Sequence, residues 1–196
     1  MIRFLRSLRR DQRGVTIVEF AIVAPVMLLM LLGFLEIAYQ VWTRATLNGA
    51  VEQAGRLSAL ESGISQQSAI DDVVRLTVND VAPQASFTFQ RRSYTDFNSV
   101  NRPEDYTDSN GNGFYNAGEC FSDVNGNGQW DSDRGITGQG GADDVTEYTV
   151  TMRYPWLMPM PSLLGWDDEN VVTARTILKN QPYDDQAQLT PTVICT

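Results

Sequence analysis

The feature that most constrains this chain is a long apolar run near its N-terminus, from Val15 to Val41. The run contains no Lys or Arg, and its only acidic residues are Glu19 and Glu36. It exceeds the roughly 20 apolar residues that cross a bilayer as a helix. An arginine-rich segment precedes it, and such basic flanks stay in the cytoplasm. The pattern predicts three parts: a basic cytoplasmic leader at 1–14, a transmembrane helix at 15–42 and an exported domain at 43–196.

Two simpler interpretations of this run compete with an assembly role. A cleavable secretory signal has an apolar core of about 7–15 residues and a small-residue cleavage site, whereas this run is longer and ends in bulky side chains. A plain membrane anchor fits the length and the orientation. It leaves Glu19 unexplained, because a carboxylate inside hydrocarbon costs several kcal/mol unless it finds a partner. A helix that packs against copies of itself or against relatives would supply that partner.

The start of the run also resembles a known family. Gly14, followed by an apolar segment with Glu19 in its fifth position, resembles the class III leader site of type IV pilins. The continuation to Val26 is similar to TadE/TadG-type pseudopilins of tight-adherence (Tad, Flp) pili. In that family a prepilin peptidase cuts after the glycine, and the glutamate pairs with the N-terminal amine of a neighbouring subunit. The resemblance implies that Gly14 precedes the cut, that Val15 is the mature N-terminus and that Glu19 is the assembly carboxylate.

Charge and composition narrow the possible functions. The 196-residue chain has a formal net charge of −9 and no histidine. An acidic exported domain argues against nucleic-acid binding, which needs a basic face, but it is compatible with divalent cations. The absence of histidine removes the commonest general base, the Ser-His triads and any His-ligated metal. We therefore expect neither an enzyme nor a nucleic-acid-binding protein.

The two cysteines, Cys120 and Cys195, both follow the membrane helix. They should therefore lie in an oxidising compartment, where a single disulfide between them can form. Two unpaired thiols are the alternative.

Hydrophobic periodicity predicts an α+β, pilin-like exported domain. Apolar residues recur at three- and four-residue steps from Arg44 to Leu60, so one helix should run from Val15 to about Glu61. A second, short helix should present Ile70, Val73, Val74, Leu76 (or Thr77), Val78 and Val81 and end before Pro83. Alternating patterns predict a small three-stranded antiparallel sheet with strands at 85–91, 147–154 and 170–178, followed by an irregular tail.

The loop from Pro155 to Gly165 is rich in proline and apolar. Two interpretations are open: the loop covers the open end of a small core, which we favour, or it forms a partner-binding or membrane-surface patch. The side chains concerned are Leu157, Met158, Met160, Leu163, Leu164 and Trp166.

An insertion at about 95–144 differs from the rest of the domain, because it is rich in Asp, Asn and Gly and repeats internally. The segment 104–116 aligns with the segment 119–131 at an offset of 15 residues. Tyr106 matches Phe121 and Tyr115 matches Trp130, and we expect these aromatic side chains to pack the two copies together.

The first copy matches the EF-hand loop pattern at every specified position. Alternate residues of such a loop point inward and offer Ca²⁺ the six to eight oxygen ligands that it takes. The expected calcium ligands of the first copy are Asp108, Asn110, Asn112, the Phe114 carbonyl, Asn116 and Glu119. Those of the second are Asp123, Asn125, Asn127, the Gln129 carbonyl, Asp131 and, in place of Arg134 at position 12, Asp133.

No amphipathic helices flank the two loops, so they are similar to the tandem calcium loops of bacterial exported proteins, such as dockerin and thrombospondin type 3 repeats. A flexible turn without metal is the alternative, because Asn-Gly and Asp-rich turns are common.

Two functions follow from these patterns. The first is a minor pseudopilin of a tight-adherence pilus, located in the inner membrane, processed by a prepilin peptidase and assembled with other pilin subunits, with an exported domain that calcium stabilises for assembly and adhesion. The second is an unprocessed, single-pass anchored calcium-dependent adhesion module. The N-terminus of the purified protein distinguishes them, since Val15 indicates processing and Met1 indicates an anchor.

Overall fold

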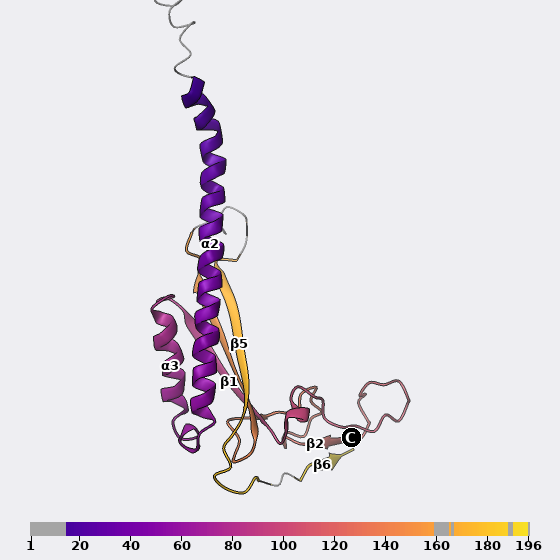
Figure 1. Ribbon diagram of the computed structural model, residues 1–196. Coiled ribbons are helices and arrows are strands. Elements are labelled where there is room, and N and C mark those ends of the chain that lie inside the picture. Colours follow the sequence, from indigo (N-terminus) through magenta and orange to yellow (C-terminus); the bar gives the residue numbers. More distant parts are fainter. Residues whose placement is uncertain (1–14, 159–164, 166, 188–189, 196) are drawn as a thin grey trace, which may run out of the picture. The chain divides into compact units, whose positions relative to one another are not determined.

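The computed structural model describes residues 15–158, 165, 167–187 and 190–195 (Figure 1). The chain divides into two compact units. One holds residues 1–42 and 156–167, and the other holds residues 43–155 and 168–196. Helix α2 contributes to both units, and the insertion belongs to the second.

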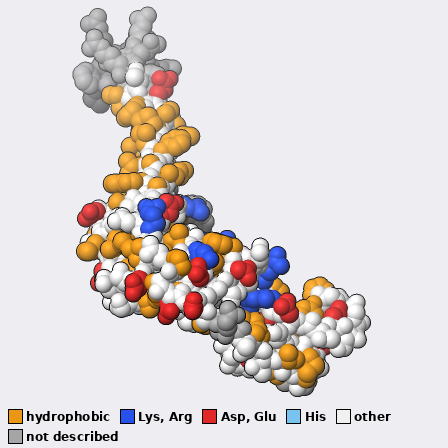
Figure 2. Space-filling view, turned by 60° about the horizontal axis from the view of Figure 1, so that its bottom comes forward, with side chains coloured by type: hydrophobic (Ala, Val, Ile, Leu, Met, Phe, Trp, Pro, Cys, Tyr) orange, Lys and Arg blue, Asp and Glu red, His pale blue; other side chains and the backbone are white. Residues whose placement is uncertain are grey.

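Helix α2 is continuous from Val15 to Ser58, which confirms the predicted long helix within three residues of its expected end. A 3-10 turn, η2, follows at Glu61–Gly63. In the first unit large apolar side chains at most positions of α2 are exposed, as a helix surrounded by lipid requires. Figure 2 shows one apolar face of this helix. Among the described residues, this is the one helix long and apolar enough to cross a membrane.

The second half of α2 changes character, because one side of it is buried in the core of the second unit. The buried side chains of this half are Leu47, Ala50, Val51 and Ala54. Helix α3, Gln67–Asn79, adds Ile70, Val74 and Val78, which recur at four-residue steps. Leu76 points away from this stripe and is 71% exposed, so its predicted place on the apolar face was wrong.

A mixed-length antiparallel sheet completes this core. The three predicted strands are confirmed as β1 (Ser86–Tyr94), β4 (Val145–Pro155) and β5 (Glu169–Lys179). A two-residue strand that the prediction missed, β3 (Ile136–Thr137), pairs with the end of β1 and gives the order β3-β1-β4-β5.

One face of the sheet is buried against the helices, and the other face is more exposed. Side chains at alternate positions of β4 are buried toward the helices, and they are Tyr148, Val150, Met152 and Tyr154. On the other face, Thr88, Thr151 and Thr173 lie in one cross-strand row. Helix α3 is tied to the sheet through Asp71, which accepts hydrogen bonds from Tyr148 (2.7 Å) and Arg91 (2.5 Å).

A separate two-stranded sheet links the insertion to the C-terminal tail, which was predicted to be irregular. Strand β2 (Phe121–Asp123) pairs antiparallel with β6 (Thr192–Ile194). Strands of three residues are too short to show an alternating pattern in the sequence. The structure joins the flanking residues Cys120 and Cys195 in a disulfide, with their Cα atoms 4.1 Å apart.

Candidate functional site

The predicted assembly residues lie at the start of α2. Gly14 is outside the described residues, and Val15 is the first residue of the helix. Glu19 follows about one turn later and is exposed. Exposure on a helix whose neighbouring side chains are apolar is what a contact with another subunit requires, and it is equally what a plain anchor would show.

The insertion consists of two loops with the same backbone path. In the first, the N–H groups of Gly111 and Gly113 each donate to the Asp108 carboxylate at 2.7 Å. In the second, Gly126 and Gly128 donate to Asp123 at 2.7 and 2.8 Å. The four glycines have φ between 73° and 78°, a left-handed conformation that glycine adopts at little cost. The sequence repeat is therefore also a structural repeat.

The asparagines at loop positions 3 and 5 extend this equivalence. Each side-chain oxygen accepts the N–H of the residue two positions later, which is the Asx-turn arrangement. The acceptor–donor pairs in the first loop are Asn110–Asn112 and Asn112–Phe114, at 3.0 and 2.8 Å, and those in the second are Asn125–Asn127 and Asn127–Gln129, at 3.0 and 2.7 Å.

Each loop is closed by a buried glutamate that lies outside the loop's first nine residues. Glu119, 5% exposed, accepts the N–H groups of Ser109 (2.9 Å) and Asn116 (2.8 Å) in the first loop. Glu104, fully buried, accepts those of Val124 (2.7 Å) and Asp131 (3.1 Å) in the second. In the alignment of the two copies, Glu104 is the first residue of the copy 104–116 and Glu119 is the first residue of the copy 119–131. Each glutamate therefore closes the loop of the other copy.

Glu104 is the site residue that the sequence reasoning missed. The second loop has Arg134 at position 12, and Asp133 was expected to substitute for the missing carboxylate. The signal that identifies Glu104 was nevertheless available, since the offset of 15 residues aligns it with Glu119.

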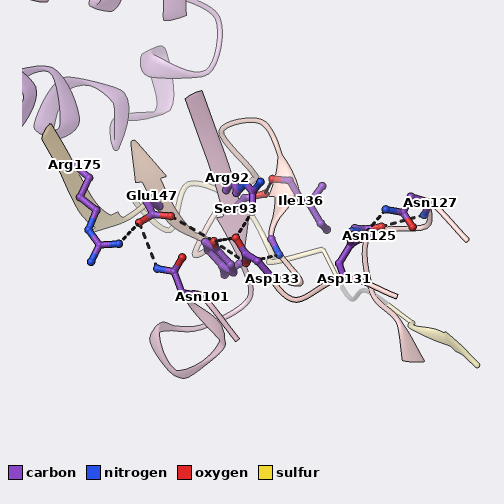
Figure 3. A network of polar contacts seen from close by, with 12 residues as sticks. Arg92, Ser93, Asn101, Asn125, Asn127, Asp131, Asp133, Ile136, Glu147 and Arg175 are labelled. Atoms are coloured by element: carbon purple, nitrogen blue, oxygen red, sulfur yellow. Dashed lines mark hydrogen bonds and ion pairs between the residues drawn. The ribbon is translucent and has the colours of Figure 1, made fainter. Parts of the chain in front are cut away.

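The structure places Asp133 in a different group of contacts (Figure 3). Its carboxylate accepts hydrogen bonds from Tyr94 at 3.0 Å and pairs with Arg92, while Asn125, Asn127 and Asp131 form a separate cluster. Arg134 donates to the Pro103 carbonyl at 2.6 Å and so links the end of the second loop to the residue before Glu104.

Aromatic side chains join the two loops, as the repeat predicts. Tyr115 and Trp130 stack with ring centroids 4.7 Å apart. Tyr106 meets both rings edge-on, and Phe121 meets Tyr115 edge-on. The Trp130 indole N–H also donates to the Glu104 carbonyl at 3.0 Å. The joint is thus built from one aromatic residue at each of the four matching positions.

The first loop favours the ionised form of Asp108. Backbone N–H groups, above all that of Gly113, lower the pKa of Asp108 below its ordinary value, because they stabilise the charged form. Asp108 therefore remains charged at neutral pH. In the second loop, Asp131 accepts the side-chain amides of Asn125 and Asn127, each at 2.6 Å.

A carboxylate offers about four lone-pair sites. Asp108 uses three of them and Glu119 uses two, all for backbone N–H groups of the loop. Both side chains keep acceptor capacity for a hard cation such as Ca²⁺. The Asx turns also leave one lone pair on the side-chain oxygens of Asn110, Asn125 and Asn127, whereas the Asn112 oxygen accepts a second hydrogen bond from the Asn116 amide at 3.3 Å. Among the described residues, no group of three or more His, Cys, Asp or Glu side chains could hold a metal, so any donor set would rely on amide and carbonyl oxygens as well.

One family model, described as TadE-like protein, matches residues 14–56. The match begins at the glycine of the predicted leader site and covers α2 almost to its end at Ser58. No curated protein and no solved structure matches the chain. The similarity therefore covers most of α2 and does not extend to the sheet or the loop repeat.

Proposed function

We propose that this protein is a minor pseudopilin of a tight-adherence pilus system, anchored in the inner membrane by α2, with its C-terminal domain exported. The observation that carries the proposal is the TadE-like match at residues 14–56, which coincides with a helix able to span a bilayer. A prepilin peptidase would cut after Gly14, and Glu19 would then contact the new N-terminus of a neighbouring pilin subunit.

Processing gives the first test. We expect the mature protein to begin at Val15, and we expect Gly14→Phe to abolish the cut, because a bulky side chain replaces the small residue beside the bond. Gly33→Ala is the matched control, since a Cβ added at Gly33 meets nothing within 4 Å and lies far from the bond. Intact mass and N-terminal sequencing provide the measurement. Continued cleavage before Val15 in Gly14→Phe would contradict the leader assignment.

We propose further that the loop repeat binds calcium. The support is the twelve-residue EF-hand pattern of the first loop together with the matching hydrogen-bond pattern of the second. The donors in the first loop would be the oxygens of Asp108, Asn110, Asn112, Phe114, Asn116 and Glu119. In the second, Glu104 takes the place that Asp133 was expected to fill. Bound calcium would fix the repeat in one conformation and so stabilise the exported domain for assembly or adhesion.

Calcium titration of the full chain in detergent micelles tests this site. We expect saturable heat in isothermal titration calorimetry and its loss for the first loop in the double variant Asp108→Ala, Glu119→Ala, because the variant lacks both carboxylates of that loop. Asp105→Ala is the matched control: its side chain is 82% exposed and only pairs with Arg134 at the surface. A flat titration of the unaltered chain would remove the calcium proposal and leave the pseudopilin proposal standing.

The runner-up function is an unprocessed, membrane-anchored calcium-dependent adhesion module. It is favoured by one observation, that the TadE-like match ends at residue 56 and leaves the repeat outside it. A purified protein that starts at Met1 would support it. In both cases we propose a binding or structural role and no catalysis.

A further inference from the structure

A carboxylate of the apolar helix is buried by a segment that returns from the sheet. Glu36 is only 5% exposed. One of its oxygens, Oε2, accepts the backbone N–H of Met158 at 3.1 Å, and the other, Oε1, is buried without a hydrogen-bond partner. Met158 belongs to the segment 156–167, which lies in the same compact unit as residues 1–42. Met158 therefore lies against the apolar helix.

The position of Glu36 along α2 fixes the depth of this contact. From Val15, which follows the basic flank, 21 residues of helix rise about 32 Å at about 1.5 Å per residue. The hydrocarbon core of a bilayer is about 30 Å thick. Glu36, and with it Met158, therefore lies where the hydrocarbon gives way to the outer headgroups.

The chemistry of the returning segment suits this depth. Non-helical backbone is tolerated there only where its polar groups are paired within the protein, and Glu36 accepts the Met158 N–H. Leu157 is 47% exposed beside it. Trp156 donates its indole N–H to the Asp167 carbonyl at 2.9 Å, which ties the two ends of the segment together. Tryptophan is enriched at membrane interfaces, where one end of the ring is apolar and the other wet.

We propose that Trp156–Met158 is a second membrane contact of this protein, seated in the outer interface of the bilayer that α2 spans, with Glu36 as the residue that sets its depth. The occupant of the Leu157 surface is lipid. The proposal rests on the proposed membrane anchor, because it takes its depth from the span of α2. It extends that function by assigning a lipid-binding role to a segment outside the residues that resemble TadE-like proteins.

Nitroxide labels at single introduced cysteines test it in the full chain, reconstituted in vesicles of phosphatidylethanolamine and phosphatidylglycerol. The native cysteines do not interfere, because they are bonded to each other. The three sites are Leu157→Cys, Ile22→Cys as the lipid reference (70% exposed on α2) and Leu76→Cys as the water reference (71% exposed on α3). Oxygen reports contact with lipid, and a water-soluble nickel chelate reports contact with water.

We expect the label at residue 157 to collide preferentially with oxygen, like the label at residue 22 and unlike that at residue 76. A label at 157 that prefers the nickel chelate, while residue 22 prefers oxygen, overturns the lipid contact and leaves the anchor intact. A label shielded from both reagents also overturns it, since a protein partner would then cover the segment. If residue 22 itself prefers the chelate, the anchor fails and the inference fails with it.

Two substitutions at Glu36 separate its role from simple packing. Glu36→Gln keeps an oxygen that can accept the Met158 N–H, so the oxygen preference at residue 157 should be unchanged. Glu36→Leu replaces that acceptor with an apolar side chain of similar size. The oxygen preference of the label at residue 157 should then fall toward that of the label at residue 76. An unchanged label in Glu36→Leu would overturn the assignment of Glu36 as the depth-setting residue.

Discussion

Replacing Glu104 by alanine is expected to open the second loop while leaving the first closed. The substitution leaves the partly buried N–H groups of Val124 and Asp131 without an acceptor. A fully buried donor left without an acceptor costs about 1–3 kcal/mol, so the free energy of unfolding of the repeat should fall by at most about 2–6 kcal/mol. Amide hydrogen exchange provides the measurement, because it separates the two loops. Exchange should accelerate at Val124 and Asp131 and stay slow at Ser109 and Asn116.

Glu119→Ala is the mirror experiment. It should accelerate exchange at Ser109 and Asn116 and spare Val124 and Asp131, because those two residues are held by Glu104. Asp105→Ala, at an exposed neighbouring carboxylate, should change neither set. Equal acceleration in both loops for either glutamate variant would contradict the reciprocal closure and indicate that the repeat opens as one body.

Breaking the disulfide has the second large expected effect. Cys120 and Cys195 are separated by 75 residues, and the chain-entropy relation gives a loop of this length a stabilisation of about 4.5 kcal/mol. The double variant Cys120→Ser, Cys195→Ser should therefore lower the free energy of unfolding by about that amount. The loss should be greatest in β2 and β6, which pair over three residues. Urea unfolding gives the total, and amide exchange locates the loss.

The unaltered protein treated with a reductant is the control for packing of the introduced serines. It should match the double variant. If both forms kept the stability and the β2–β6 protection of the oxidised protein, the bond would have no part in holding the tail to the repeat.

The long elements of this fold were predictable because each has a period that can be counted. The run from Val15 and the spacing of Ile70, Val74 and Val78 predict helices that the structure confirms. The alternation in 147–154 likewise predicts β4. Strands β2, β3 and β6 were missed because pairs and triplets of residues carry no period, and tertiary contacts alone make them strands.

The candidate site shows a different limit of sequence reasoning. A linear loop pattern assigns all ligands to twelve consecutive residues. For the second loop it therefore predicts a carboxylate ligand next to Arg134, which is Asp133. The fold instead brings Glu104 back from 20 residues upstream to accept the Val124 N–H. Reading the two copies as a pair, rather than one after the other, would have assigned Glu104 from its alignment with Glu119.

The exchange of glutamates between the two copies also determines what can be added to or removed from this domain. A single copy of the repeat carries a loop and a glutamate that accepts hydrogen bonds from the other copy's loop. In one copy alone, the loop would lack its closing glutamate and the glutamate would lack its N–H donors. Deleting either copy should therefore disable the one that remains. We therefore expect the smallest module that keeps both loops closed to be the duplicated pair, residues 104–131. Arg134 and the Cys120–Cys195 disulfide attach this pair to the rest of the domain.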